Sequence, residues 1–294
     1  MGRIFTNYKL QYNYWPQEKV NMLTDAQLVA IAQQIKTAQD EARQIAPLTS
    51  QVADFDLTCA YAVADLIHRK RVQQGAVPVG RKIGFTNPDM WSLYGVREPI
   101  WAFMYNTTVA AVTGGHTTCS IGRFTEPKIE PEIVFHFRSA PPIGGDPSAI
   151  LRCIDWVAHG FEIVQSHFPR WKFRAPDTVA DWALHGTLLV GEPQAMDRLG
   201  PALVAKLESF SLSLFCNDSL REVGTGANVL GSPLLAVAHI IGVLQKQADS
   251  MPLQAGEMVT TGTITLAQTI RAGERWKTEV QGIGLPGLSV EFGP

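Results

Sequence analysis

The sequence predicts an α+β protein with one main domain, residues 79–294, preceded by a helical layer, residues 22–78. Helix signals gather in the layer, whereas from Val79 onward short apolar runs alternate with clusters of Gly, Pro, Asn and Asp. Helices followed mostly by strands favour an α+β fold over a doubly wound sheet. The 294 residues suffice for one large domain with a small helical appendage. We therefore treat both parts as one structural unit.

Two helices are expected in the helical layer. Thr24 followed by Gln27 forms a capping box, and apolar residues then repeat at helical spacing until Pro47 stops the helix. A second helix is expected at about Asp56–Gln73, where basic residues in the last turn suit a helix C-terminus.

The main domain is expected to consist mostly of strands, with two further helices at about Pro147–Ala158 and Pro233–Gln245. Short apolar runs bounded by turn-forming residues are typical of strands. The runs are Val79–Phe85, Thr108–Val112, Ile129–Phe137, Phe161–Val164, Thr187–Val190, Leu212–Cys216, Met258–Thr261 and Leu288–Phe292.

Composition and charge exclude several classes of partner. The formal net charge of −2 gives no basic excess, so we expect neither nucleic acid nor an anionic membrane as a partner. Four cysteines without a CxxC pair indicate reduced, mostly buried thiols in a cytoplasmic protein. Residues 1–21 lack the apolar core of a signal peptide and are interpreted as an irregular arm. We expect no uninterrupted apolar stretch long enough to cross a bilayer.

Two glutamates lie on one face of the expected strand Ile129–Phe137. Strand alternation places Glu130 and Glu132 on the same side, with Cα atoms roughly 7 Å apart. Like charges held so close and half buried repel each other unless a cation or a proton lies between them. Pro131 cannot donate a ladder hydrogen bond, which predicts a sheet edge or a bulge at this point.

A third carboxylate, Glu162, lies inside the apolar run Phe161–Val164, where a lone charge is unfavourable unless it is paired or binds a metal. Three carboxylates without Cys or His at ligand spacing favour Mg²⁺ or Mn²⁺ over Zn²⁺. The alternative is a solvated Glu-x-Glu face with Glu162 paired to an arginine. Spacing alone leaves both interpretations open.

Several segments match, in order and spacing, the motifs of one known family. Val79–Asn87 contains a G-x-K-I-G-x-T pattern, and Tyr94–Ile100 contains a G-V-x-E-P turn. The other matching segments are Lys128–Phe137, Gly160–Gly191, Gly224–Leu234 and Gly282–Phe292. Read together, over roughly residues 56 to 293, they resemble the 2-hydroxypentadienoate (2-keto-4-pentenoate) hydratase and 4-oxalocrotonate decarboxylase group of the fumarylacetoacetate hydrolase superfamily.

This resemblance implies a mixed, rolled and strongly bent sheet with flanking helices, which forms dimers or larger homo-oligomers. It implies that Glu130, Glu132 and Glu162 bind one divalent ion, Mg²⁺ or alternatively Mn²⁺. A 2-oxo acid can chelate such an ion, which then stabilises the enolate formed on proton transfer or C–C cleavage. The resemblance makes Lys82 a substrate-binding or acid–base residue; without it, Lys82 reads as a solvated lysine on an edge strand.

The chain departs from the family pattern around the implied site. Many members follow the third glutamate with Asp-Ser-Arg, where this chain has Gln165, Ser166 and His167; later they have Asp-Asn-Ala-Ser, where this chain has Asp181, Trp182, Ala183 and Leu184. His167 and His185 are candidates for a replacement acid–base group, because imidazole titrates near neutrality. Either could equally be a hydrogen-bonded core histidine. Asp181 is expected to orient groups in the pocket.

Three further residues are candidates for substrate binding. Arg170 and Arg174 lie in the segment Pro169–Arg174, which mixes cations with aromatics; a loop over the pocket could bring one of them to a distal carboxylate. The alternative is a surface loop whose aromatic residues pack inward. Thr263, in a turn-like stretch, could donate its hydroxyl to the substrate.

The leading functional hypothesis is a Mg²⁺-dependent lyase, a hydratase of 2-hydroxy-2,4-dienoates in the catabolism of aromatic or related compounds. The alternatives, in order, are a decarboxylase of a 4-oxalocrotonate-like diacid, a C–C bond hydrolase of the same superfamily, and a non-catalytic protein. The hydrolase ranks lower because we find no N-terminal His/Glu dyad of the kind that activates water there. The non-catalytic protein would bind a 2-oxo or 2-enol acid or join a mixed complex with a pathway enzyme; turnover by the purified homo-oligomer would distinguish it.

Overall fold

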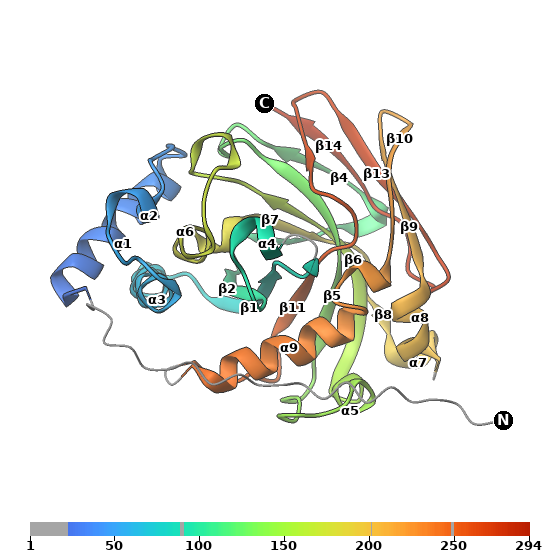
Figure 1. The fold of residues 1–294 in the computed structure, drawn as a ribbon. Coiled ribbons are helices and arrows are strands. Elements are labelled where there is room, and N and C mark those ends of the chain that lie inside the picture. Colours follow the sequence, from blue (N-terminus) through green and yellow to red (C-terminus); the bar gives the residue numbers. More distant parts are fainter. Residues whose placement is uncertain (1–22, 89–90, 201, 248–249) are drawn as a thin grey trace.

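The computed structural model describes residues 23–88, 91–200, 202–247 and 250–294, so the expected N-terminal arm lies outside the described residues. Within these ranges the chain forms a nine-stranded mixed sheet and a five-stranded sheet, with helices on both sides (Figure 1). The α+β class with a rolled mixed sheet, predicted from the sequence, is confirmed.

The larger sheet carries the expected glutamates. Its pairing is antiparallel apart from the parallel pairs β1–β11 and β3–β7. Two short strands, β12 and β8, pair with β5 and β6 respectively. The path across the sheet is β2 (Ile100–Tyr105), β1 (Pro78–Gly84), β11 (Met258–Thr263), β5 (Lys128–Phe137), β6 (Ile154–Val164), β7 (His185–Val190) and β3 (Val109–Ala111), with β12 at Gln268–Thr269 and β8 at Gln194–Ala195.

The smaller sheet packs against the apolar face of β5. Ile129, Ile133, Phe135 and Phe137 of β5 are all fully buried in the core that the two sheets share with helix α9. This apolar face fixes the opposite face of β5 as the one that presents its glutamates. The order of the smaller sheet is β10 (Ser219–Thr225), β9 (Ser211–Cys216), β13 (Arg275–Gln281), β14 (Ser289–Gly293) and β4 (His116–Ser120).

The helices form a layer on one side of the larger sheet and a separate group near α9 (Figure 1). The layer has its own core, in which residues of α1, α3 and α6 pack with β2. The helices of the layer are α1 (Asp25–Asp40), α2 (Leu48–Gln51), α3 (Leu57–Gln73) and α6 (Ala175–Ala180). The others are α4 (Trp91–Tyr94), α5 (Pro147–Leu151), α7 (Met196–Leu199), α8 (Leu203–Ser209) and α9 (Pro233–Lys246).

Two helix predictions were wrong in their extent. Helix α1 ends at Asp40 and does not continue to Pro47, because Ala42 adopts a left-handed conformation with φ 48° and the Arg43 N–H turns back to the Ala38 carbonyl. The helix expected at Pro147–Ala158 ends at Leu151, and its second half belongs to β6, where pairing with β5 overrides local preference. The capping box at Thr24 and the start of α3 after Asp56 are confirmed.

The apolar helix α9 bears on the expectation that no apolar stretch crosses a bilayer. By length and composition alone, the helical stretch Gly226–Lys246 could cross a membrane, with a mean hydropathy of 1.8. Within the fold 56% of that window is buried, and α9 contributes Leu234, Val237 and Ile240 to the main core.

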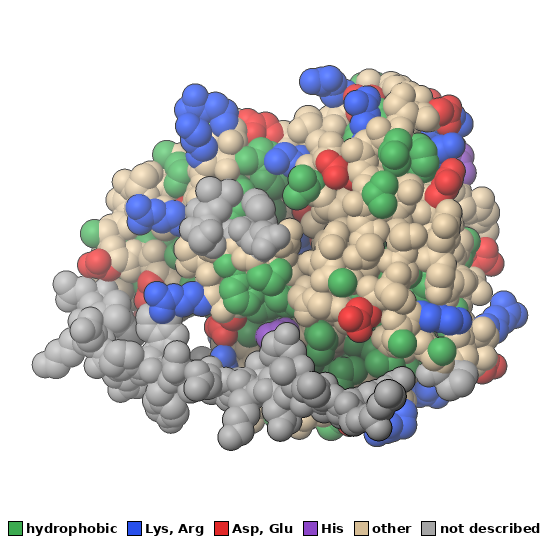
Figure 2. Space-filling model, turned by 45° about the vertical axis from the view of Figure 1, so that its right-hand side comes forward, with side chains coloured by type: hydrophobic (Ala, Val, Ile, Leu, Met, Phe, Trp, Pro, Cys, Tyr) green, Lys and Arg blue, Asp and Glu red, His purple; other side chains and the backbone are tan. Residues whose placement is uncertain are grey.

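On the face shown in Figure 2, the described Lys and Arg side chains are scattered among acidic and neutral ones.

Candidate active site

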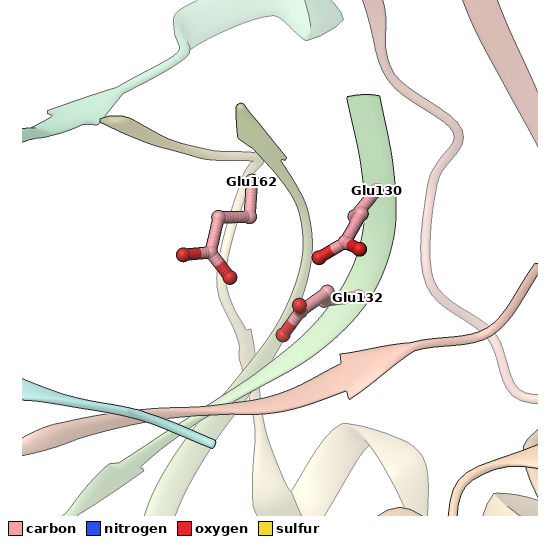
Figure 3. Close-up of side chains that lie close together, drawn as sticks. All are labelled: Glu130, Glu132 and Glu162. Carbon is pink, nitrogen blue, oxygen red and sulfur yellow. The ribbon is translucent and has the colours of Figure 1, made fainter. Parts of the chain in front are cut away.

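The three glutamates predicted as metal ligands come together on β5 and β6. Glu130 lies directly opposite Glu162 in the antiparallel register, and Glu132 follows two residues along on the same face. Each offers a carboxylate oxygen, and these three oxygens lie within 4.8 Å of one another (Figure 3). Glu132 and Glu162 are fully buried, whereas Glu130 is partly exposed. The cluster therefore has one open side.

A bulge in β11 provides a hydrogen-bond donor to Glu132. Three steps on β11, from Thr260 to Thr263, oppose two steps on β5, and within this bulge Gly262 has φ 95° and donates its N–H to Glu132 Oε2 at 2.8 Å. A Cβ at Gly262 would lie 1.8 Å from Thr86 Oγ1, so only glycine fits. Pro131 therefore lies beside a bulge; the alternative of a sheet edge was wrong, since β5 is central.

Lys82 faces the carboxylates from β1. Its Nζ lies 3.3 Å from Glu162 Oε2 and donates to the Ala183 carbonyl at 3.0 Å. The side chain is buried on a strand between β2 and β11, so the alternative of a solvated edge-strand lysine was wrong. Its neighbour Arg81 points the other way, towards Glu257, as alternation predicts.

The carbonyl that receives Lys82 belongs to a left-handed turn. Trp182, Ala183 and Leu184 have φ values of 59°, 47° and 64°, a conformation that side-chain-bearing residues rarely adopt in succession. The turn is held by a hydrogen bond from the Leu184 N–H to the Asp181 carbonyl and by the Trp182 indole N–H, which donates to the Phe103 carbonyl. None of the three residues is glycine, so their types do not predict a left-handed turn here.

Both ring nitrogens of His185 are engaged. Nδ1 lies 2.8 Å from Glu162 Oε1, and because a carboxylate can only accept, Nδ1 carries the proton. Nε2 lies 2.9 Å from Thr108 Oγ1. His185 is buried and fixes the orientation of the Glu162 carboxylate, an arrangement that resembles the outer-shell partners of metal ligands.

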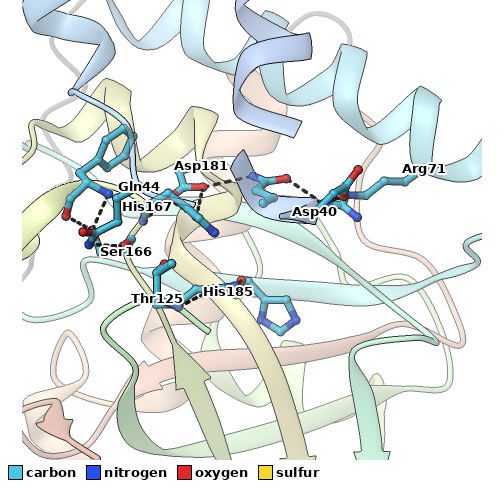
Figure 4. Close-up of polar contacts among 11 residues, drawn as sticks. Asp40, Gln44, Arg71, Thr125, Ser166, His167, Asp181 and His185 are labelled. Atoms are coloured by element: carbon cyan, nitrogen blue, oxygen red, sulfur yellow. Dashed lines mark hydrogen bonds and ion pairs between the residues drawn. The ribbon is translucent and has the colours of Figure 1, made fainter. Parts of the chain in front are cut away.

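His167 has one engaged nitrogen and one without a protein partner. Nδ1 lies 2.8 and 3.0 Å from the two carboxylate oxygens of Asp181, and the His167 backbone N–H also donates to Asp181 (Figure 4). Nε2 is buried and has no hydrogen-bond partner among the described residues. Asp181 thus holds His167 in the tautomer that leaves Nε2 as an acceptor.

The pKa values of the cluster reflect three buried carboxylates close to one ammonium, that of Lys82. Burial raises the pKa of Glu130 to about 7, against the attraction of Lys82 and with the repulsion of Glu162. Burial, Glu162 and Glu130 likewise raise the pKa of Glu132 well above its usual range. Burial also acts against ionisation of Glu162, but Lys82 and His185 outweigh it and hold its pKa at about 2.

His185 and Lys82, the two partners of Glu162, each stay in one charge state. Burial opposes the charge on Lys82, but the three carboxylates outweigh it and raise its pKa. Burial lowers the pKa of His185, despite the attraction of Glu162. At neutral pH the site therefore contains an ammonium, a neutral imidazole and an ionised Glu162.

Of the three expected substrate-binding residues, Thr263 lies opposite Glu132 on the neighbouring strand, whereas Arg170 and Arg174 lie at the surface. Arg170 is exposed and its backbone N–H donates to Glu126, and Arg174 is exposed at the start of α6. Within the described part of the chain, neither guanidinium forms an ion pair with the three glutamates. The hydroxyl of Thr263 donates to the Thr265 carbonyl at 2.8 Å, although its Cα pairs with that of Glu132.

Comparison with known proteins places this arrangement in a family. No family model matches the chain. The chain is 29% identical to the 2-keto-4-pentenoate hydratase 2 of Dechloromonas aromatica (strain RCB), over 87% of this chain and 94% of that protein. It is also 29% identical to the 4-oxalocrotonate decarboxylase of Pseudomonas putida, over 89% of this chain and 96% of that protein.

Solved structures agree with these relatives. The 4-oxalocrotonate decarboxylase from Pseudomonas putida G7, complexed with magnesium and adipate, superimposes with a TM-score of 0.83 at 27% identity, covering 92% of this chain and 99% of that one. The chain belongs to the fumarylacetoacetate hydrolase superfamily. A fumarylpyruvate hydrolase from Pseudomonas aeruginosa shares the fold, with a TM-score of 0.56 at 14% identity over 72% of this chain and 88% of that one.

The superfamily assignment confirms the resemblance drawn from the ordered motifs. Sequence reasoning missed three contributors to the site: the Gly262 amide, the Thr108 hydroxyl and the Ala183 carbonyl. A Gly-containing turn next to a predicted strand was the one available signal, for Gly262. The other two contacts depend on tertiary structure.

Proposed function

We propose that this protein is a divalent-metal-dependent lyase that adds water to a 2-hydroxy-2,4-dienoate or its 2-oxo-enoate tautomer. The observation that carries the proposal is the cluster of Glu130, Glu132 and Glu162, whose carboxylate oxygens converge within 4.8 Å on a partly open side of the sheet. The hydratase and decarboxylase relatives, matched over most of their length, support this reaction class.

The residues present fit a hard divalent cation such as Mg²⁺, with Mn²⁺ as the alternative. All three donors are carboxylates, the ligand type that Mg²⁺ prefers. Glu132 Oε1 is buried without a hydrogen-bond partner among the described residues, and the buried Glu162 Oε2 faces the Lys82 ammonium at 3.3 Å. When bound, such an ion supplies Lewis-acid stabilisation of the negative charge that develops on a 2-oxo acid. The magnesium in the decarboxylase from Pseudomonas putida G7 supports this choice of ion.

Lys82 is proposed to hold the substrate's carboxylate end. Its ammonium is buried and stays protonated, and Ala183 and Glu162 take up two of its three donor positions. The remaining donor is free to bind an anionic oxygen. Because the left-handed turn fixes the Ala183 carbonyl, the lysine is oriented before the substrate arrives.

His167 is proposed as the acid–base group, oriented by Asp181. The reaction needs two proton movements: ketonisation of the dienol, and addition of water across the conjugated double bond, with hydroxyl to one carbon and proton to the other. A general base needs a lone pair that no other group engages, and Nε2 of His167 has no hydrogen-bond partner among the described residues. His185 lacks one, since Glu162 and Thr108 engage both of its nitrogens, and it is proposed to orient Glu162.

Decarboxylation of a 4-oxalocrotonate-like diacid is the second candidate function. It is favoured by decarboxylase relatives as similar as the hydratases, and by the diacid adipate in the superimposed decarboxylase. In hydration and in decarboxylation alike, negative charge develops on the 2-oxo group of the substrate. Arg170 and Arg174 remain proposed partners of a distal carboxylate, which only the diacid substrate would provide.

The test follows hydration and CO₂ release separately. The purified protein is incubated with a panel of 2-hydroxydienoates and 2-oxo diacids, with Mg²⁺ and then with EDTA. Hydration that requires Mg²⁺ and is lost in Glu132→Ala supports the proposal, and CO₂ release without hydration would favour the decarboxylase. Activity indifferent to EDTA and to Glu132→Ala would refute the metal mechanism, and a complete lack of turnover would favour a non-catalytic partner subunit.

Assembly and location extend the proposal. We propose a cytoplasmic homo-oligomer, which the family resemblance and the bacterial metabolic enzymes among its relatives support. A mixed complex with a pathway enzyme is the alternative assembly. Light scattering of the purified protein, alone and mixed with a pathway enzyme, separates the two.

A further inference from the structure

A hydrogen-bonded chain joins the helical layer to the His167–Asp181 pair (Figure 4). Asp181 is 1% exposed, and three N–H groups point at its carboxylate: the backbone and Nδ1 of His167, and Nε2 of Gln39 at 3.2 Å. Gln39 lies in α1, 142 positions away in the sequence. Among the described residues, the amide of Gln39 is therefore the group of the helical layer that donates a hydrogen bond to the Asp181 side chain.

The amide of Gln39 is held in one orientation by Arg71 of α3. The Arg71 guanidinium donates to Gln39 Oε1 at 2.7 Å, and because a guanidinium only donates, the amide oxygen must face Arg71. The amide NH₂ is then directed to Asp181. A flipped amide would place two donors together at Arg71 and two acceptors together at Asp181, so the contacts define the polarity of the chain.

Arg71 is itself fixed close to the site. Its guanidinium carbon lies 4.1 Å from the centre of the Trp182 ring and its Nη2 lies 3.8 Å from Asp40, while Asp181 contributes to its electrostatic environment. Trp182 belongs to the left-handed turn and packs edge-on against His185 at 5.1 Å. The positive charge of Arg71 thus reaches Asp181 through the polarised amide of Gln39.

We propose that Gln39 and Arg71 are positioning residues, which hold the Asp181 carboxylate in line with Nδ1 of His167. The inference rests on the proposed function, because it assigns the helical layer a part in the acid–base role of His167. A buried carboxylate with one fewer donor would be free to rotate, and His167 would lose the constraint that keeps its proton on Nδ1.

The test compares Gln39→Leu with a matched control on the same helix, Gln33→Leu. Gln33 donates to Thr37 at 3.1 Å on an exposed part of α1, so its loss removes one glutamine hydrogen bond away from the site. Gln39→Leu is expected to lower kcat about tenfold, as for a hydrogen bond lost from a charged group, with KM within about twofold. Gln33→Leu should leave both constants unchanged.

Two further variants separate positioning from packing. Gln39→Glu keeps an acceptor for Arg71 but presents a second acceptor to Asp181, so it should be no more active than Gln39→Leu; a packing role would tolerate it. Arg71→Met should lower kcat by a similar factor, and the Arg71→Met/Gln39→Leu double variant should be little worse than either single one, because both act through one chain. Wild-type kcat in Gln39→Leu or Gln39→Glu would overturn the inference.

A measurement without substrate makes the inference independent of the proposed function. In ¹⁵N-histidine-labelled protein, the Nδ1-protonated tautomer of His167 should dominate in the parent and in Gln33→Leu, and lose population in Gln39→Leu and Arg71→Met. An unchanged tautomer in both site variants would overturn the inference. An inactive parent in which the tautomer still responds would instead refute the proposed function and leave the chain of contacts supported.

Discussion

The carboxylate cluster and the His167–Asp181 pair are built in opposite ways. In the cluster, a buried oxygen of Glu132 lacks a hydrogen-bond partner in the described chain, whereas three N–H groups donate to the Asp181 carboxylate. At the pair the atom without a partner is a nitrogen, Nε2 of His167. The cluster is thus arranged to accept a cation and the pair to accept a proton, which the following predictions are designed to separate.

The largest effect is expected from losing a carboxylate of the cluster. Glu132→Gln should lower Mg²⁺-dependent hydration on the order of a thousandfold, the equivalent of several kcal/mol of charge stabilisation. Asp155→Asn is the control, since Asp155 lies on the neighbouring strand β6 and pairs with His136 of β5, outside the cluster. Steady-state rates with saturating Mg²⁺ measure both; equal activity of the two variants would contradict the assignment of the cluster.

Removing the buried cation should separate substrate binding from metal binding. Lys82→Met is expected to lower kcat/KM roughly a hundredfold or more, because a buried charge–charge contact with the substrate is lost. Mg²⁺ affinity should be retained or increased, since a positive charge 3.3 Å from Glu162 has gone. Kinetics and Mg²⁺ titration measure the two effects; a parallel loss of Mg²⁺ affinity would show that Lys82 only supports the fold of the site.

The two histidines should fail in different ways. His167→Gln is expected to lower kcat about a hundredfold, as for a lost acid–base group, with Mg²⁺ affinity unchanged. His185→Gln should instead weaken Mg²⁺ binding roughly tenfold or more, because His185 orients Glu162. If saturating Mg²⁺ restored His167→Gln but not His185→Gln, the proposed roles would be reversed.

The smallest effect is a pH dependence of metal stabilisation. The pKa of Glu130 is raised to about 7, so without metal this carboxylate binds more protons folded than unfolded between about pH 4.5 and 7, and stability falls as the pH rises through this window. Mg²⁺ displaces that proton, so its stabilising effect should grow over the same window. The Tm difference between Mg²⁺ and EDTA should increase from pH 5.5 to 8; a constant difference would contradict the shifted pKa.

The same two regions differ in how far the sequence alone could predict them. Period-two alternation placed Glu130 and Glu132 on one face, because it depends only on local strand geometry. Placing Glu162 opposite Glu130 required the β5–β6 register, and β6 was itself half mistaken for a helix. Motif order supplied that information where local patterns could not.

The surroundings of His167 were beyond prediction for a physical reason. Asp181 and Gln39 are 142 positions apart in the sequence. No periodicity of the sequence relates a helix of the helical layer to a turn so far along the chain. The left-handed turn at Trp182, Ala183 and Leu184 violates backbone preference, so propensity argues against it. Both features are tertiary contacts that appear only once the helical layer packs on the sheet.

The most direct test of the central claim is a calorimetric titration of Mg²⁺ into the wild-type protein and Glu132→Gln, after treatment of both with EDTA. The account predicts one Mg²⁺ site per chain in the wild type, proton release that increases towards acidic pH, and loss of the site in the variant. Wild-type protein that binds no Mg²⁺, or a variant that binds it equally well, would contradict the proposal that Glu130, Glu132 and Glu162 form a metal centre.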